Sequence, residues 1–285
     1  MRIIFTLSLL FIFSLLSYSQ YNPGARQISL ANSDVALAND VFSLFSNPSG
    51  LAQLNWREVG VYYSPAPFGL TELSNGYVAY HEPLSFGSVA VGGMTYGFDL
   101  YRESKVLLGY SYNYNNIFFT GVAVNYHNFS IKNYGSTGVF YINLGGLVYI
   151  LDELRWGFLI ANINKATVAD IDDQIPMVLS TGFSFNILEN FSLNFSLEKD
   201  IRYNPSVQFG IDYDIIEYLS LRIGASNEPS RFTAGLGINY SIFSLDYAFF
   251  THPDLGLTHQ VGIILSFGKE GNRSVAIRKH LQSGN

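Results

Sequence analysis

The sequence of 285 residues contains no cysteine, so no disulfide bond can stabilise its fold. Charged residues are also scarce, at 13% of the chain against about 25% in an average soluble domain. Basic side chains are fewer than acidic ones, 16 against 22, and the net charge of −6 argues against nucleic acid as a partner. The chain must therefore be held together by its own backbone hydrogen bonding and packing.

Long apolar runs are missing too, except for one at the start of the chain. Ile3 to Leu16 is apolar apart from three hydroxyl residues, and it follows the basic dipeptide Met1-Arg2. The small residues at the outer positions of Ser17-Tyr18-Ser19 end it, which predicts a signal peptide over residues 1–19. No later run reaches 18 apolar residues, so no other segment is expected to span a membrane as a helix.

Aromatic residues, in contrast, are abundant at 16% of the chain, and they lie in segments that alternate. Residues 191–197 read FSLNFSL, with every odd position apolar and every even position polar. Residues 232–240 repeat the pattern, with Thr, Gly and Asn between the large residues. A soluble β-sandwich would alternate as well, but charges would cover its outer face, and these segments have few charges on either face. The pattern predicts an all-β fold, a transmembrane antiparallel β-barrel over residues 55–267.

About fourteen strands are expected, near 55–64, 73–82, 85–97, 103–112, 117–127, 138–149, 154–163, 176–187, 191–199, 205–214, 218–226, 231–240, 242–250 and 258–267. Short connections alternate with mostly longer ones, such as 128–137 and 164–175, as do the periplasmic turns and outer loops of bacterial barrels. An even strand number places both mature termini in the periplasm of a Gram-negative bacterium, with the barrel in the outer membrane. Residues 268–285 are predicted to form a polar, flexible periplasmic tail.

The segment 20–54 lacks alternation and precedes the first strand, which makes it the candidate for a plug. A fourteen-stranded barrel is wider than the eight-stranded kind that its own side chains fill, so another segment has to occupy the lumen. Asp40 is expected to cap a short helix, and Asn47 to end that helix because it precedes Pro48. Gly50 then supplies a turn towards the first strand. The segment is predicted to be a small helical hatch inside the barrel.

Three short stretches of this segment are similar to a known family. Gly24-Ala25-Arg26, Ala36-Leu37-Ala38-Asn39-Asp40 and Asn47-Pro48-Ser49-Gly50-Leu51-Ala52 resemble the N-terminal hatch of the FadL-type outer-membrane transporter superfamily. They are closest to its branch of PorV- and PorQ-like barrels, which accompany type IX secretion. The chain departs from that pattern at Ala31-Asn32-Ser33, where the glycines are missing, at Asn39 and at Ser49. The resemblance implies the following hatch or gate residues: Arg26, Asn39, Asp40, Asn47, Pro48 and Gly50.

Arg26 is the one basic residue of the hatch, and four carboxylates are candidates for its partner: Asp34, Asp40, Asp212 and Asp246. Such a pair could act as a latch that opens a path, although a structural salt bridge that seats the plug explains it better. Four apolar residues fall on the mainly small or polar face of the strands and are candidates to line the lumen: Ile117, Phe119, Leu159 and Ile264.

Nothing in the sequence favours an enzyme, a cofactor or a metal site. The five histidines are scattered, and no HExxH or GxSxG motif occurs. Asp170, Asp172 and Asp173 are better explained as solvated loop charge than as a cation site. Two functions remain: passage of small hydrophobic molecules across the outer membrane, or a non-transporting accessory or cargo-docking barrel of a type IX secretion system. The expected partners are outer-membrane lipid, with either a hydrophobic small-molecule ligand or secretion-system proteins.

Overall fold

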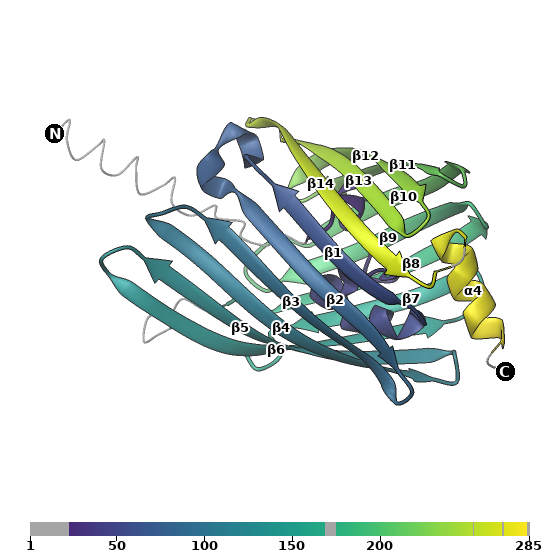
Figure 1. Ribbon diagram of the computed structural model, residues 1–285. Coiled ribbons are helices and arrows are strands. Elements are labelled where there is room, and N and C mark those ends of the chain that lie inside the picture. Colours follow the sequence, from purple (N-terminus) through teal and green to yellow (C-terminus); the bar gives the residue numbers. More distant parts are fainter. Residues whose placement is uncertain (1–22, 169–174, 253, 270, 284–285) are drawn as a thin grey trace.

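The computed structural model describes residues 23–283 except 169–174, 253 and 270. Within that part of the chain, fourteen antiparallel strands form one closed barrel in which sequence neighbours pair (Figure 1). The strands are β1 Arg57–Ser64, β2 Asn75–Leu84, β3 Gly87–Gly97, β4 Tyr101–Tyr114, β5 Phe118–Ile131, β6 Gly135–Tyr149, β7 Leu154–Ala161, β8 Val178–Leu188, β9 Phe191–Asp200, β10 Ser206–Ile216, β11 Leu219–Asn227, β12 Ser230–Tyr240, β13 Phe243–His252 and β14 Gly256–Phe267. The predicted fold class is confirmed. The predicted leader over residues 1–19 and the aspartates 170, 172 and 173 lie outside the described residues.

The first strand closes the barrel by pairing with the last. β1 and β14 are antiparallel, in a register that sets Arg57 opposite Phe267 and Tyr63 opposite Val261. Hydrocarbon offers no partner for the N–H and C=O groups of a free strand edge, so only a closed sheet is stable in a membrane. The predicted pairing of the first and last strands is confirmed.

The two faces of the wall differ as the alternation predicts. On β12, Thr233, Gly235 and Gly237 are buried inside the barrel, whereas Phe232, Leu236 and Ile238 are 69, 45 and 52% exposed on the outside. The other strands repeat this arrangement, with exposed outer residues such as Val78, Val106, Ile223, Leu245 and Ile263. The wall therefore presents large apolar side chains outwards, the arrangement of a barrel that faces lipid.

The connections differ in part from the expectation. The barrel has a short-turn end, where β2–β3, β4–β5, β6–β7, β8–β9, β10–β11 and β12–β13 are joined, and a loop end opposite. The predicted loop over 128–137 is wrong, because β5 continues to Ile131 and β6 begins at Gly135. The β1–β2 connection contains two 3-10 turns, η3 Pro67–Gly69 and η4 Thr71–Leu73.

The C-terminal segment is not the flexible tail that its polarity predicted. It forms α4, Arg273–Ser283, which lies across the short-turn end of the barrel (Figure 1). Ile277 and Leu281, one turn apart, are buried against Leu54 and Trp56, where the hatch meets β1. Ile277 and Leu281 give the helix its apolar side, which the mainly polar composition of the segment does not reveal. Among the described helices, none combines the length and the apolar character needed to cross a bilayer.

The outward position of Leu236, in the middle of β12, generates a prediction for the Leu236→Arg variant. An arginine at the lipid face near the bilayer midplane should lower the free energy of unfolding by about 2–4 kcal/mol. Urea unfolding in lipid vesicles, followed by tryptophan fluorescence, measures it. Tyr134→Arg at the exposed β5–β6 turn is the control and should change the free energy little. Equal losses in both variants would contradict the membrane-facing assignment.

Candidate functional site

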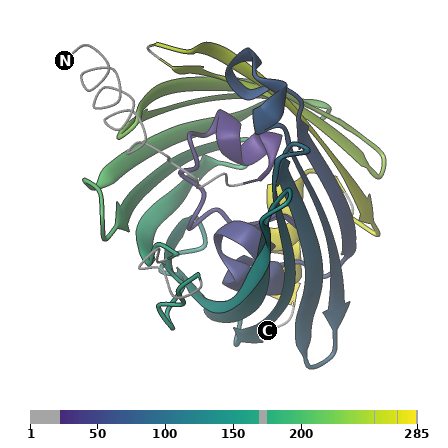
Figure 2. The same ribbon diagram turned by 90° about the vertical axis from the view of Figure 1, so that its left-hand side faces the viewer.

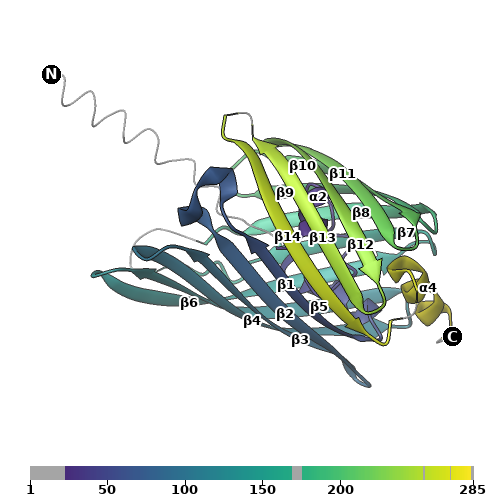
Figure 3. The same cartoon turned by 45° about the horizontal axis from the view of Figure 1, so that its top comes forward.

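The hatch, residues 23–54 of the described chain, lies inside the barrel. It contains α2 Ala25–Ser29, α3 Ser43–Ser46 and the 3-10 helix η2 Pro48–Gln53. Figure 2, seen from the end opposite α4, shows this segment as coils within the lumen. Figure 3 shows α2 behind the wall formed by β12, β13 and β14. Nearly all of its residues are buried, so the hatch fills the middle of the barrel.

Arg26 ties the hatch to the wall through a buried ion network. Its Nη2 lies 2.9 Å from Asp212 Oδ2 on β10, and its Nη1 lies 3.4 Å from Asp40 Oδ2 within the hatch. Its Nη1 also donates to Asn39 Oδ1. On the wall, Arg222 of β11 links Asp212, at 2.9 Å, to Asp246 of β13, at 2.5 Å. Two arginines and three aspartates thus satisfy one another away from solvent, which is the condition for a stable buried ion pair.

Of the four carboxylates considered for Arg26, the structure pairs it with Asp212 and Asp40. Asp246 pairs instead with Arg222, which the sequence analysis missed. Asp34 accepts a hydrogen bond from Ser46 Oγ at 3.0 Å. Burial raises the pKa of Asp34 to about 6, although this hydrogen bond by itself lowers that pKa. The sequence could have pointed to Arg222, because it is the one cation on the mainly small and polar face of its strand.

A second polar centre surrounds Glu58, a fully buried residue of β1. Its carboxylate accepts hydrogen bonds from the backbone N–H of Val41 in the hatch, at 2.9 Å, and from Ser266 Oγ of β14, at 2.8 Å. Arg273 of α4 donates to the same carboxylate at 2.6 Å and to the backbone oxygen of Asn39 at 2.9 Å. The C-terminal helix therefore holds the hatch in place from the short-turn end. The sequence analysis predicted no role for Glu58 or Arg273.

Asn47, Pro48 and Gly50 shape the second half of the hatch. Asn47 is extended, with φ −149° and ψ 96°, and α3 ends before it, as predicted from the following proline. Its side chain donates to the backbone oxygens of Val35 and Gly146 and accepts from Ser49, so it fastens this turn to β6. Gly50 is required by space, because an added β-carbon would lie 1.9 Å from the backbone oxygen of Ala38. Asp40 does not cap the helix as predicted, because α3 begins after Phe42 without a side-chain cap; Asp40 instead accepts from the Phe42 N–H, at 2.9 Å, in the turn before it.

The wall meets the hatch through a ring of inward glycines, here called the glycine girdle. An added β-carbon on Gly121 of β5 would lie 2.3 Å from the Ser49 nitrogen, closer than any real contact. A comparable closeness, under 3 Å, recurs on every strand except β2, β9, β13 and β14. The girdle consists of Gly60, Gly92, Gly109, Gly121, Gly145, Gly157, Gly182, Gly210, Gly224, Gly235 and, more loosely, Gly262. The hatch therefore packs on the bare backbone of the wall.

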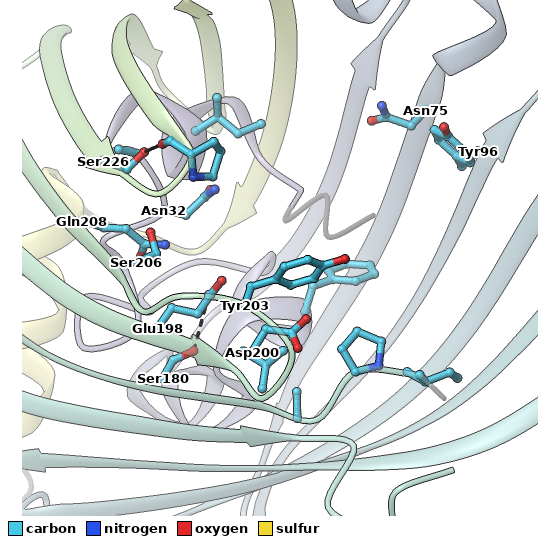
Figure 4. A pocket seen from close by; sticks show the side chains of 18 of the residues that line it. Asn32, Asn75, Tyr96, Ser180, Glu198, Asp200, Tyr203, Ser206, Gln208 and Ser226 are labelled. Carbon is cyan, nitrogen blue, oxygen red and sulfur yellow. Dashed lines mark hydrogen bonds between the residues drawn. The ribbon is translucent and has the colours of Figure 1, made fainter. Parts of the chain in front are cut away.

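A cavity of about 710 Å³ lies on the loop-end side of the hatch. Hatch residues Ile28, Ala31, Asn32 and Phe45 contribute to its floor. Its walls come from strand ends on all sides, and Figure 4 shows Glu198, Asp200 and Tyr203 facing Asn75 and Tyr96 across it. A volume in this range suits a small-molecule ligand. A polar pocket of about 50 Å³ lies on the opposite side of Arg26, bounded by Asp212, Asp246, Lys269 and Arg273.

The predicted lumen residues separate into three environments. Leu159 lines the cavity, whereas Ile264 borders the small pocket beside Asp212 and Asp246. Phe119 is fully buried, but it packs with Leu147 against the underside of the hatch and α4. None of the predicted gate residues, Arg26, Asn39, Asp40, Asn47, Pro48 and Gly50, lines the cavity.

Ile117 was wrongly assigned to the lumen. It is 57% exposed and belongs to the β4–β5 turn, because β5 begins one residue later at Phe118. The preceding Asn115 and Asn116 both have positive φ, of 54° and 57°. These left-handed residues reverse the chain at the end of β4, so the alternation of β5 does not extend back to position 117.

The arrangement defines a class: a closed transmembrane β-barrel with its own N-terminal hatch and a ligand-sized cavity above it. Within the described residues, no group of three or more His, Asp or Glu side chains could hold a metal ion.

Comparisons with known proteins place the fold. No protein-family model matches the sequence, and no curated protein matches it. A FadL homologue of Pseudomonas aeruginosa superposes with a TM-score of 0.62 at 11% identity, over 87% of this chain and 97% of that chain. The toluene transporter TodX of Pseudomonas putida gives 0.56 at 12% identity, over 79% and 92%. A TodX deltaS2S3 variant, a monoaromatic hydrocarbon channel, gives 0.60 at 12%, over 80% and 94%. The chain has the fold of FadL-type barrels, whereas its place in the PorV/PorQ branch stays a prediction.

The buried ion network generates a prediction for Arg26→Met. The variant keeps the apolar stem but leaves Asp40 and Asp212 short of a cation, and breaking a buried pair costs about 3–5 kcal/mol. The chain has two tryptophans, and Trp56 lies beside the hatch, so a Trp156→Phe background makes Trp56 the reporter of urea unfolding. Arg57→Met, which breaks the surface pair with Glu82, should cost about 0–1 kcal/mol. Equal losses would show that the network does not seat the hatch.

The glycine girdle generates a prediction for Gly121→Ala. The new methyl group collides with the hatch backbone at Ser49, and overpacking of this kind typically costs about 1–3 kcal/mol. The hatch should loosen, so trypsin should cut after Arg26, which is buried in the native protein. Appearance of a new N-terminus at Gln27 measures this. In Gly76→Ala the nearest atom is 3.6 Å away, and cleavage should stay at the native level. Native protection of both variants would rule out a tight fit at the girdle.

Proposed function

We propose that the protein is an outer-membrane channel of the FadL type that lets small hydrophobic or amphipathic molecules cross the outer membrane. The observation that carries the proposal is the cavity of about 710 Å³, which reaches the loop end at Pro67, Asn204 and Glu228 and ends on the hatch. The apolar outer wall fits a lipid environment, and outer-membrane lipid is its expected partner. The fold shared with a toluene transporter agrees with a channel role.

In this proposal a ligand enters from the loop end, binds above the hatch and leaves after part of the hatch has moved. The small pocket on the opposite side of Arg26, bordered by Ile264, is the next space on that route. The ion network and the girdle seat the hatch, so passage requires that some of these contacts break. A role as an accessory barrel of type IX secretion stays a prediction with no observation in its favour.

A reversible lock tests both passage and hatch movement. The chain has no cysteine, and a β-carbon on Gly262 of β14 would lie 3.5 Å from Cβ of Ala25, a separation that suits a disulfide. The double variant Ala25→Cys/Gly262→Cys therefore fastens α2 to the wall when oxidised. The measurement is uptake of labelled toluene and oleate by Gram-negative cells that express the protein.

Saturable uptake of at least one probe should exceed that of cells without the protein. Uptake should fall severalfold in the oxidised double variant and recover on reduction, while each single-cysteine variant stays unaffected by oxidant. Uptake no greater than in cells without the protein would overturn the proposed channel. Uptake that the lock does not change would keep the channel but exclude movement of α2.

A further inference from the structure

Carboxyl groups outnumber basic groups in the lining of the cavity. Its lining contains four carboxylates, Glu103, Glu198, Asp200 and Glu228, but only two arginines, Arg202 and Arg231, and no lysine among the described lining residues. Figure 4 shows Glu198 and Asp200 directed into the pocket from β9, with Ser180 hydrogen-bonded to Glu198. A ligand that carries its own carboxylate therefore meets an acidic wall.

The positive groups of the lining are already engaged. Arg202 Nη2 lies 3.1 Å from Asp200 Oδ2, and the guanidinium of Arg231 lies 5.0 Å from the ring centre of Phe250. His127 Nε2 lies 2.9 Å from Glu103 Oε2, so any charge on this imidazole is matched by that carboxylate. Each cationic side chain of the lining therefore already has a carboxylate or an aromatic ring beside it.

The cavity also contains buried polar oxygens without a hydrogen-bond partner among the described residues. Ser64 and Asn75 are cross-strand neighbours on β1 and β2, and both line the cavity at only 1 and 2% exposure. Asn75 Oδ1 and Ser64 Oγ have no hydrogen-bond partner among the described residues, and the same holds for Asn32 Oδ1 on the hatch. An amide oxygen can only accept, so each of these two asparagines needs a donor.

Aromatic rings provide the remaining surface. Phe45 belongs to the floor, Phe129 and Tyr141 come from β5 and β6, and Tyr96 and Phe250 come from β3 and β13. The ring centre of Phe129 lies 4.1 Å from that of His127, so these two rings pack together beside Glu103. Such faces suit a planar aromatic ligand through stacked or edge-to-face contacts.

From these observations we infer that the cavity selects small aromatic molecules that donate hydrogen bonds, namely uncharged alcohols or phenols and cationic amines, and that it rejects aromatic carboxylates. The inference names the ligand class of the proposed channel and so rests on that function. Carboxylates and amide oxygens accept from the donor group of the ligand, while the ring packs on Phe129, Tyr141 and Phe250.

Three probes that share one ring separate the possibilities: benzyl alcohol, benzylamine in its protonated form, and benzoate. Each is titrated calorimetrically at neutral pH into purified full-length protein in detergent. Benzyl alcohol and benzylammonium should bind at least about tenfold more tightly than benzoate, because benzoate adds a like charge and removes the donor.

Glu198→Gln tests the acidic wall at one position. Benzylammonium should lose affinity severalfold in this variant, whereas benzyl alcohol should keep its affinity, since glutamine still offers an acceptor oxygen. Asn75→Leu should weaken both probes that donate. Glu82→Gln, on the outer surface beside Arg57, is the matched control and should change neither affinity.

Benzoate that binds as tightly as benzyl alcohol, or an unchanged preference for benzylammonium in Glu198→Gln, would overturn the inference. Failure of all three probes to bind would also overturn it, and the uptake of toluene or oleate would then decide separately whether the channel itself survives. Absence of uptake together with tight binding of benzyl alcohol would remove the channel and leave a binding barrel with the inferred selectivity.

Discussion

The close approach between the hatch and the bare backbone of the wall is the constraint on which the rest of the structure depends. An inward side chain at Gly121 or Gly235 would occupy the space of Ser49 or Ser29. Because the wall has no side chains at the girdle glycines, there is room for a hatch of some thirty residues inside a barrel of fourteen strands. The glycines weaken the strands slightly, and the closed ladder of hydrogen bonds offsets that loss. The hatch then divides the lumen into a large cavity at the loop end and a small pocket at the short-turn end.

Steric fit at the girdle does not by itself orient the hatch, and the two polar centres supply the orientation. Arg26 reaches Asp212 on one side of the lumen, while the Val41 N–H reaches Glu58 on another. Each centre joins segments that are far apart in sequence, and Arg273 brings the C-terminal helix into the second one. Buried charges are stable only when they are paired, so rotation of the hatch would leave several of them unsatisfied. The packing at the glycine girdle and the ion pairs of the two polar centres therefore specify the same position of the hatch in the barrel.

The sequence predicted the strands well because alternation reports directly on which face meets lipid. All fourteen expected strands exist, although their ends move by several residues, as at β5 and β6. Ile117 was misplaced because alternation does not show where two left-handed asparagines interrupt a strand. Arg222, Glu58 and Arg273 were missed because their partners come from other strands and from α4, and a single sequence contains no information on those distances. The glycine girdle could not be predicted either, because one glycine in one strand carries no such information. The pairing register of the strands brings these glycines together around the hatch.

Two different sets of residues determine the plug and the ligand. No girdle glycine is among the described residues that line the cavity, and neither Arg26 nor Asp212 lines it. Conversely, Glu198, Asn75 and Tyr141 line the cavity without belonging to either polar centre. Substitutions in the cavity lining can therefore change its chemistry while the residues that seat the hatch stay the same. At 11–12% identity, the likeness to FadL-type barrels concerns the fold, which the alternation and the plug determine. The choice of ligand has to be argued from this chain's own carboxylates, amides and rings.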